Sequence, residues 1–219
     1  MNLLFDFGGV LVDLDKSRCI AAFDAIGFDV RPFLGTFAQA GILSKLERGE
    51  VSVGEFCEEL RQLSGQSHLS DEAIVEAWQQ YLLDVPEERL DMLLKARQHY
   101  PLYVLSNTNE IHWKMARDGY FRYKNLHVED FFEKVFLSYE LGVEKPHPAI
   151  FKSVVEGLGC SPEDVLFFDD SEVNCQAARD CGLQALLAPA GSLWLQYFDA
   201  DGHLLGKQET DLVYPSVDQ

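Results

Sequence analysis

Five short apolar runs most constrain what this chain of 219 residues can fold into. Each has three or four consecutive apolar residues, a pattern typical of parallel strands that are buried on both faces. Stretches with helical periodicity separate the runs. This alternation predicts an α/β fold in which a doubly wound parallel sheet is covered by helices on both faces. The expected strands are residues 3–5, 102–105, 134–137, 165–168 and 184–187.

A helical insert follows the first expected strand. Residues 16–84 contain helical patterns and no convincing strand, whereas strands and helices alternate after residue 85. We therefore expect a core built from residues 1–15 and 85–219, with residues 16–84 forming a small helical cap. Two short linkers, near Asp15 and Asp84, join the two parts. Such linkers would permit closure of the cap over the core.

Local signals refine this picture at three places. A helix is expected over residues 37–46, although it contains Gly41. Ser52, with Glu55 three residues later, is a capping-box pattern that starts another helix. The tail from about residue 192 to 219 has Asp-Gly between apolar residues, which predicts a hairpin.

Composition excludes several classes of partner. The formal net charge of −18 argues against binding to nucleic acid or to anionic membranes, because both carry negative charge. No apolar run is long enough to span a bilayer, and no signal peptide is visible, so we expect a cytoplasmic protein. The five cysteines show no framework spacing and are expected to be reduced. A monomer or a weak homodimer is expected.

Polar clusters follow the ends of the expected strands. Asp6, Ser106 and the pair Asp169-Asp170 come directly after apolar runs, and Lys145 lies in a polar cluster between the third and the fourth run. Ligands bind at this edge of open α/β sheets. A carboxylate can attack phosphorus when a divalent cation and a lysine neutralise the charge, so the combination suits phosphoryl transfer. Each residue alone would more often be a cap, a turn residue or a surface charge.

These clusters also carry a family resemblance. The segments 5–13 (FDFGGVLVD), 105–107 (LSN), 141–148 (LGVEKPHP) and 167–171 (FFDDS) resemble, in this order, the four motifs of haloacid dehalogenase-like hydrolases. The matches extend from residue 5 to about 182. The insert resembles the helical cap of one large branch of that family, and the chain is similar to its sugar-1-phosphate phosphatases.

The resemblance implies roles for the motif residues. Asp6 would be the nucleophile that becomes phosphorylated, Ser106 would bind a phosphate oxygen, and Lys145 would neutralise both groups. Mg²⁺ would be held by Asp6, Asp170 and the backbone carbonyl of Gly8. The implied substrate is a small phosphorylated metabolite.

Four further residues are expected to complete the site. Asp169 would support the metal site, and Asn107 would contact the phosphate or the leaving group. Gly9 would provide the backbone geometry of the phosphate-binding loop. Arg48, in the charged segment 47–50 of the cap, is a candidate for substrate recognition.

One position departs from the family pattern. Most phosphatases of the family carry a second aspartate two residues after the nucleophile, where it acts as general acid and base, but this chain has Gly8. General acid–base catalysis is worth ~10²–10⁴ in rate. A substrate with a good leaving group, such as a sugar 1-phosphate or an acyl phosphate, would tolerate the loss. Alternatively, Thr108, Asn109, His112 or Glu47 would replace the missing group.

Two other functions stay open at this point. Hydrolytic dehalogenases of the family also lack the second aspartate, because a halide leaves without a proton. They need no metal, however, and the Asp169-Asp170 pair favours one. The other alternative is a protein that binds a phosphorylated ligand with little turnover.

Overall fold

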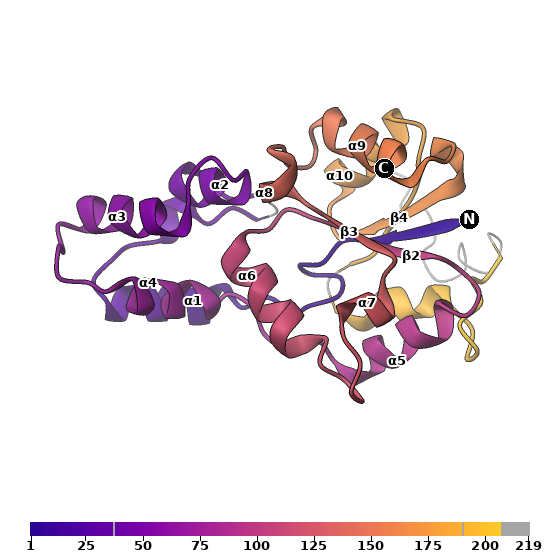
Figure 1. The fold of residues 1–219 in the computed structure, drawn as a ribbon, viewed down its shortest axis with the longest axis horizontal. Coiled ribbons are helices and arrows are strands. Elements are labelled where there is room, and N and C mark those ends of the chain that lie inside the picture. Colours follow the sequence, from indigo (N-terminus) through magenta and orange to yellow (C-terminus); the bar gives the residue numbers. More distant parts are fainter. Residues whose placement is uncertain (37, 190, 207–219) are drawn as a thin grey trace, which may run out of the picture.

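The computed structural model describes residues 1–36, 38–189 and 191–206. Its centre is a parallel sheet of five strands in the order β3-β2-β1-β4-β5 (Figure 1). The predicted α/β fold and all five predicted strands are confirmed. The strands are β1 (Asn2–Phe5), β2 (Leu102–Ser106), β3 (Lys134–Leu137), β4 (Val165–Asp169) and β5 (Gln184–Leu187).

Helices cover both faces of the sheet, because each strand contains a run of apolar residues that sends alternate side chains to opposite faces. In β1, Leu4 packs into one hydrophobic cluster, whereas Leu3 and Phe5 belong to the other. The Leu4 side is covered by α9 (Pro148–Leu158) and α10 (Glu172–Asp180), and the Phe5 side by α5 (Glu87–Ala96) and the 3₁₀ segment Ser192–Tyr197 (Figure 1). The remaining core elements are α6 (Glu110–Met115), the π-turn Ala116–Tyr120, α7 (Val128–Phe131), α8 (Ser138–Leu141) and the 3₁₀ turn Pro162–Asp164.

Four helices of the insert lie together at one end of the molecule (Figure 1). Phe23, Phe56 and Trp78 are fully buried between them, in a cluster that continues into the core. The two connecting segments pair with each other, since the amide of Asp15 donates to the carbonyl of Tyr81 at 2.9 Å. The exact division of the chain into core and cap stays a prediction. The four helices are α1 (Lys16–Ala25), α2 (Gly41–Glu47), α3 (Val53–Ser64) and α4 (Asp71–Gln79). A 3₁₀ turn, Arg31–Phe33, lies between α1 and α2.

The helix predicted over residues 37–46 is shorter than expected. Helix α2 begins only at Gly41, after Ala40 in an extended conformation. Gly41 has φ +54°, and a Cβ there would lie 2.7 Å from the ring of Phe33, so the chain turns sharply at this glycine. Residue 37 lies outside the described residues. The capping box of Ser52 and Glu55 is confirmed at the start of α3.

The predicted C-terminal hairpin is present only as a short turn. Phe198 and Leu204 form an antiparallel bridge, and Asp199 closes the turn by accepting hydrogen bonds from the amides of Asp201 and His203. Residues 207–219 of the predicted hairpin tail lie outside the described residues. All five cysteines are free.

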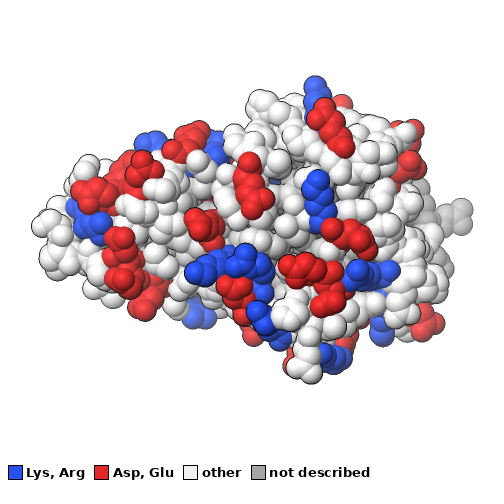
Figure 2. All heavy atoms as spheres, viewed as in Figure 1, with Lys and Arg blue, Asp and Glu red and all other residues white. Residues whose placement is uncertain are grey.

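The surface carries both signs of charge. Figure 2 shows acidic and basic side chains interspersed over one face of the molecule, with no broad basic surface on that face. The expectation that the protein does not bind nucleic acid stays a prediction. Among the described residues, no helix has the length and apolar character needed to cross a bilayer.

Candidate active site

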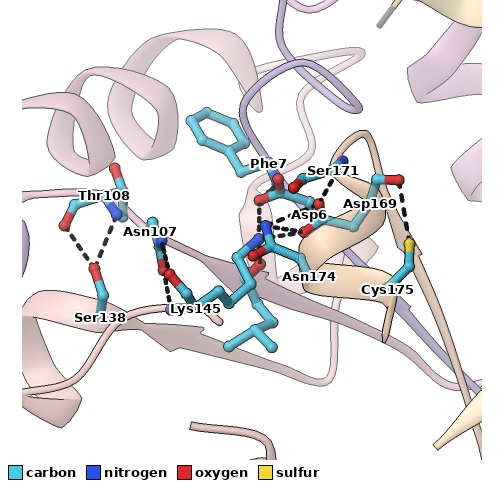
Figure 3. A network of polar contacts seen from close by, with 11 residues as sticks. Asp6, Phe7, Asn107, Thr108, Ser138, Lys145, Asp169, Ser171, Asn174 and Cys175 are labelled. Carbon is cyan, nitrogen blue, oxygen red and sulfur yellow. Dashed lines mark hydrogen bonds and ion pairs between the residues drawn. The ribbon is translucent and has the colours of Figure 1, made fainter. Parts of the chain in front are cut away.

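The carboxyl ends of the central strands bring the predicted motif residues together. Asp6 follows β1, Ser106 ends β2, and Asp169 ends β4, so the parallel register places all three at one edge of the sheet. Lys145 reaches the same point from the loop that precedes α9 (Figure 3). Four segments that are distant in sequence therefore form one polar cluster.

Lys145 is the centre of that cluster. Its Nζ lies 2.8 Å from Oδ1 of Asp6 and 2.6 Å from Oδ2 of Asp169, and it also donates to the carbonyl of Leu105 at 3.3 Å. The side chain is buried. Burial alone would lower the pKa of the ammonium, but Asp169 and Asp6 outweigh it and hold that pKa above its ordinary value. The residue is therefore charged at any physiological pH.

Asp169 is occupied by protein donors. Its Oδ1 accepts from the amide of Ser171 at 2.8 Å and from Nδ2 of Asn174 at 3.0 Å, while Oδ2 accepts from Lys145 (Figure 3). The carboxylate is fully buried. These contacts favour a supporting role, in which Asp169 holds the lysine and the loop that carries Asp170.

Asp6 and Asp170 are poised for a cation. Oxygen atoms of Asp6, Asp169 and Asp170 lie within 4.8 Å of one another. Burial raises the pKa of Asp6 well above its usual range despite the opposing effect of Lys145, and burial together with Asp169 raises the pKa of Asp170 to about 6. When Asp6, Asp169 and Asp170 are all ionised, the single ammonium group of Lys145 leaves two of their three negative charges without compensation. The donor set thus fits a divalent cation with a preference for oxygen ligands, such as Mg²⁺.

Gly9 makes this arrangement possible. It has φ +82°, and a Cβ at this position would lie 2.2 Å from Oδ2 of Asp170. Only glycine lets the loop after β1 approach the carboxylate so closely. Gly9 thus serves the site through its backbone, and Gly8 lines the adjoining cavity.

The hydroxyl of Ser106 fits a phosphate oxygen. It is buried, and within residues 1–36, 38–189 and 191–206 its Oγ has no hydrogen-bond partner. Buried hydroxyls normally have a partner, so an unsatisfied one beside a charged cluster favours an external acceptor.

Two of the predicted contact residues are held by protein partners. Asn107 lines the cavity over Asp6, and its side chain accepts from the backbone amide of Lys145 at 2.7 Å and donates to the carbonyl of the same residue at 2.9 Å (Figure 3), so its contact with substrate stays a prediction. It therefore positions the lysine loop. Arg48 does not line the cavity over Asp6; it pairs with Glu50 at 2.7 Å and with Glu144 at 3.1 Å. The contact with Glu144 ties this end of α2 to the core, and a role of Arg48 in substrate recognition stays a prediction.

A cavity of about 60 Å³ lies over Asp6, between core and cap. The core contributes Asp6, Lys145, Asp170 and several neighbours, and the cap contributes residues that the motifs did not single out. Periodicity cannot show which cap side chains face a cavity formed by another part of the chain. The cap residues and linker residues in the lining are Leu14, Thr36, Gln39, Glu47, Tyr81 and Leu82.

The end of α2 is docked onto the core. Oγ of Ser138 lies 2.5 Å from the backbone carbonyl of Glu47 and accepts from the amide of Thr108 at 2.9 Å. Gly49 has φ +65°, and a Cβ there would lie 2.1 Å from the carbonyl oxygen of Tyr139. The close approach holds the cap against the edge of the sheet where the site lies.

We expect Gly49→Ala to destabilise the protein. The left-handed conformation costs a non-glycine residue about 1–2 kcal/mol, and the clash with the Tyr139 carbonyl adds to it. Gly54→Ala is the matched control, because a Cβ there meets nothing within 4 Å and alanine in a helix gains roughly 0.5–1 kcal/mol over glycine. Thermal unfolding should show a lower Tm for the first variant and an equal or higher Tm for the second. Equal Tm values for both variants would contradict a close contact between Gly49 and the Tyr139 carbonyl.

The fold and site define a hydrolase with a Rossmann-like core, a helical cap and an acidic cluster around a buried lysine. Residues 1–182 match the model of the haloacid dehalogenase-like hydrolase family, and the chain belongs to this family.

Relatives and solved structures resemble the chain over most of its length. It is 34% identical to a D-ribitol-5-phosphate phosphatase of Bacteroides thetaiotaomicron, over 89% of this chain and 95% of the relative. A HAD-family enzyme from the same organism, solved with magnesium and inorganic phosphate, superposes with a TM-score of 0.85 and 43% identity, covering 90% of this chain and 98% of that one. A HAD-like hydrolase from Porphyromonas gingivalis gives a TM-score of 0.81 and 32% identity, covering 89% and 93%.

Proposed function

We propose that the protein is a Mg²⁺-dependent phosphatase of small phosphorylated sugars or polyols, with Asp6 as the nucleophile. The observation that carries this proposal is the position of Asp6. Its carboxylate faces the cavity, 2.8 Å from the ammonium of Lys145 and within a cluster of three carboxylates. A nucleophile next to a fixed positive charge and a cation site is suited to attack on a phosphate ester.

The residues divide the work as follows. Asp6, Asp170 and the carbonyl of Gly8 would hold the ion, which when bound lowers the charge on the phosphate and on the nucleophile. Lys145 orients Asp6 and stabilises charge on the transferred group. Ser106 offers its free hydroxyl to a phosphate oxygen.

The substrate class rests on the relatives and on the size of the site. The similar D-ribitol-5-phosphate phosphatase favours a phosphorylated polyol, and sugar 1-phosphates remain candidates from the motif resemblance. The cavity has room for a phosphate-sized group or a few water molecules, but not for a whole sugar phosphate. We expect the cap to move about the linkers near Asp15 and Asp84 when the substrate enters.

The function is tested by phosphate release from a panel that contains D-ribitol 5-phosphate, glucose 1-phosphate and acetyl phosphate. We expect release from at least one compound in Mg²⁺ and none in chelator. Release that persists in chelator would overturn the metal-dependent mechanism. No release from any compound would overturn the phosphatase proposal. In that case, chloride release from 2-haloacids would indicate the dehalogenase alternative.

Asp170→Asn should remove the response of the fold to Mg²⁺. A ligand at 100 times its Kd stabilises the folded state by about 2.7 kcal/mol, which should raise the Tm of the wild type. Without the Asp170 carboxylate, the rise should largely disappear. Asp180→Asn, an exposed carboxylate at the end of α10, is the matched control and should keep the full rise. An unchanged rise in Asp170→Asn would place the ion elsewhere, whereas a rise in the wild type without any phosphate release would favour the binding protein.

A further inference from the structure

We propose that Glu47 of the cap is the proton donor and acceptor of this active site, in place of the carboxylate that Gly8 lacks. The inference rests on the phosphatase function proposed above and names a further catalytic residue for it. Three observations support it: Glu47 lines the same cavity as Asp6, its carboxyl group is buried and protonated, and the other ionisable groups of the described cavity lining have other roles.

The position of Glu47 is set by the core. Its backbone carbonyl contacts Ser138, and Gly49 packs against the backbone of Tyr139 two residues later. These contacts hold the end of α2 over the sheet edge, and the Glu47 side chain lines the same cavity as Asp6. A carboxyl residue of the cap thus shares one cavity with Asp6, into which a leaving group would depart.

The carboxyl group of Glu47 is buried and free. The residue is 5% exposed. Within the described part of the chain, no hydrogen bond and no ion pair reaches the carboxyl oxygens of Glu47. A buried carboxyl group normally has such partners, and their lack leaves this one available to a substrate or to water.

The surroundings favour the protonated form. Burial, then the negative charges of Glu144 and Asp6, raise the pKa of Glu47 to about 8, against the weaker opposing effects of Arg48 and Lys145. At neutral pH the group therefore has a proton to give. After giving it, the group is a base strong enough to accept one from water near neutral pH.

The other ionisable groups of the cavity are unsuited to this role. Both ring nitrogens of His112 have hydrogen-bond partners: Nε2 lies 3.0 Å from the carbonyl oxygen of Trp78, and Nδ1 lies 3.3 Å from the side-chain Nδ2 of Asn109. Burial also lowers the pKa of His112 to about 4. Burial raises the pKa of the Tyr81 phenol above its ordinary value, which makes it a weak acid. Lys145 is committed to two carboxylates.

The remaining two acids are needed for other tasks, since Asp6 is the proposed nucleophile and Asp170 a proposed metal ligand. Among the lining residues that the structure describes, Glu47 is thus the one carboxyl group left over.

The proposed steps balance. In the first, a carboxylate oxygen of Asp6 forms a bond to phosphorus, the bond from phosphorus to the alcohol oxygen breaks, and that oxygen takes the proton of Glu47 to leave as an alcohol. In the second, the Glu47 carboxylate takes a proton from water while the water oxygen bonds to phosphorus. The bond between Asp6 and phosphorus breaks, which releases inorganic phosphate and restores both residues.

The test compares Glu47→Gln with the wild type on two substrates. For D-ribitol 5-phosphate, whose alkoxide is a poor leaving group, kcat should fall by ~10²–10⁴. For p-nitrophenyl phosphate, the first step needs no proton, so the variant should release about one equivalent of nitrophenol rapidly and then turn over slowly. The loss of rate above about pH 8 in the wild type should disappear in the variant, because the group that loses its proton there is gone. Glu76→Gln, an exposed glutamate of α4, is the control and should behave as wild type.

The outcomes separate the two proposals. A wild type that releases phosphate neither from p-nitrophenyl phosphate nor from any compound of the panel overturns the phosphatase function and this inference with it. If the wild type is active but Glu47→Gln keeps its kcat on the polyol phosphate, only the inference on Glu47 is overturned. The inference would also be overturned if Glu47→Gln slowed the rapid release of nitrophenol by the same factor as it lowers kcat on D-ribitol 5-phosphate. A purely structural role of Glu47 would slow the reaction of both substrates equally.

Discussion

Asp6→Asn is expected to reduce kcat by about 10⁴–10⁶, the scale of effect seen when a covalent nucleophile is removed. An amide cannot form the phosphorylated intermediate, yet it has nearly the shape of the carboxyl group. The fold should survive, because Lys145 keeps its contact with Asp169 at 2.6 Å. Asp180→Asn serves again as an exposed control and should be fully active.

The measurement for this variant is twofold. Steady-state phosphate release gives the change in kcat. Acid-quenched wild type, mixed with a substrate from the panel, should also show a population heavier by one phosphoryl group in intact-protein mass spectrometry, and Asp6→Asn should not. A variant that retains either the activity or the added phosphoryl group would show that Asp6 is not the nucleophile.

Lys145→Met is expected to have the largest effect on stability. The substitution keeps the approximate length of the side chain but removes the ammonium group that contacts Asp6 and Asp169. Breaking a buried ion pair from one side costs about 3–5 kcal/mol, because a buried charge is left without compensation. At roughly 2–4 °C per kcal/mol for a chain of this size, the Tm should fall by about 10 °C or more.

The control and the companion variant sharpen this prediction. Lys152→Met, at an exposed position of α9, should leave the Tm nearly unchanged. In the double variant Asp6→Asn with Lys145→Met, part of the lost stability should return, since one of the two uncompensated carboxylates is gone. Additive losses in the double variant would contradict a direct interaction between these two residues.

The sheet and the site core could be read from local patterns. A continuous apolar run such as residues 165–168 is stable only as a strand buried on both faces, so the strand was predictable without the rest of the molecule. Parallel strands present their carboxyl ends at one edge, so Asp6, Ser106 and Asp169 were expected to meet there. Their chemical types then indicated phosphoryl transfer, and membership of the family agrees with that reading.

The roles of the polar neighbours were less predictable. Asn107 and Arg48 were predicted as substrate contacts, and the structure adds protein partners that the sequence did not indicate. The partner of Asn107 lies nearly 40 residues away in sequence, and that of Arg48 nearly 100 residues away. A polar side chain is compatible with many partners, and only its three-dimensional neighbours show which of them it satisfies.

The sequence by itself determined the strands, the order of the motifs and the position of Asp6 at the end of β1, because these follow from periodicity and from the geometry of parallel sheets. Only the tertiary structure decided which groups are desolvated together. Glu47 is buried, and no described residue pairs with its carboxyl group, because the end of α2 packs against Ser138 and Tyr139. Whether a carboxylate is a solvated surface charge or a proton carrier depends on burial and on neighbouring charges, and both arise from contacts between segments that are remote in the chain.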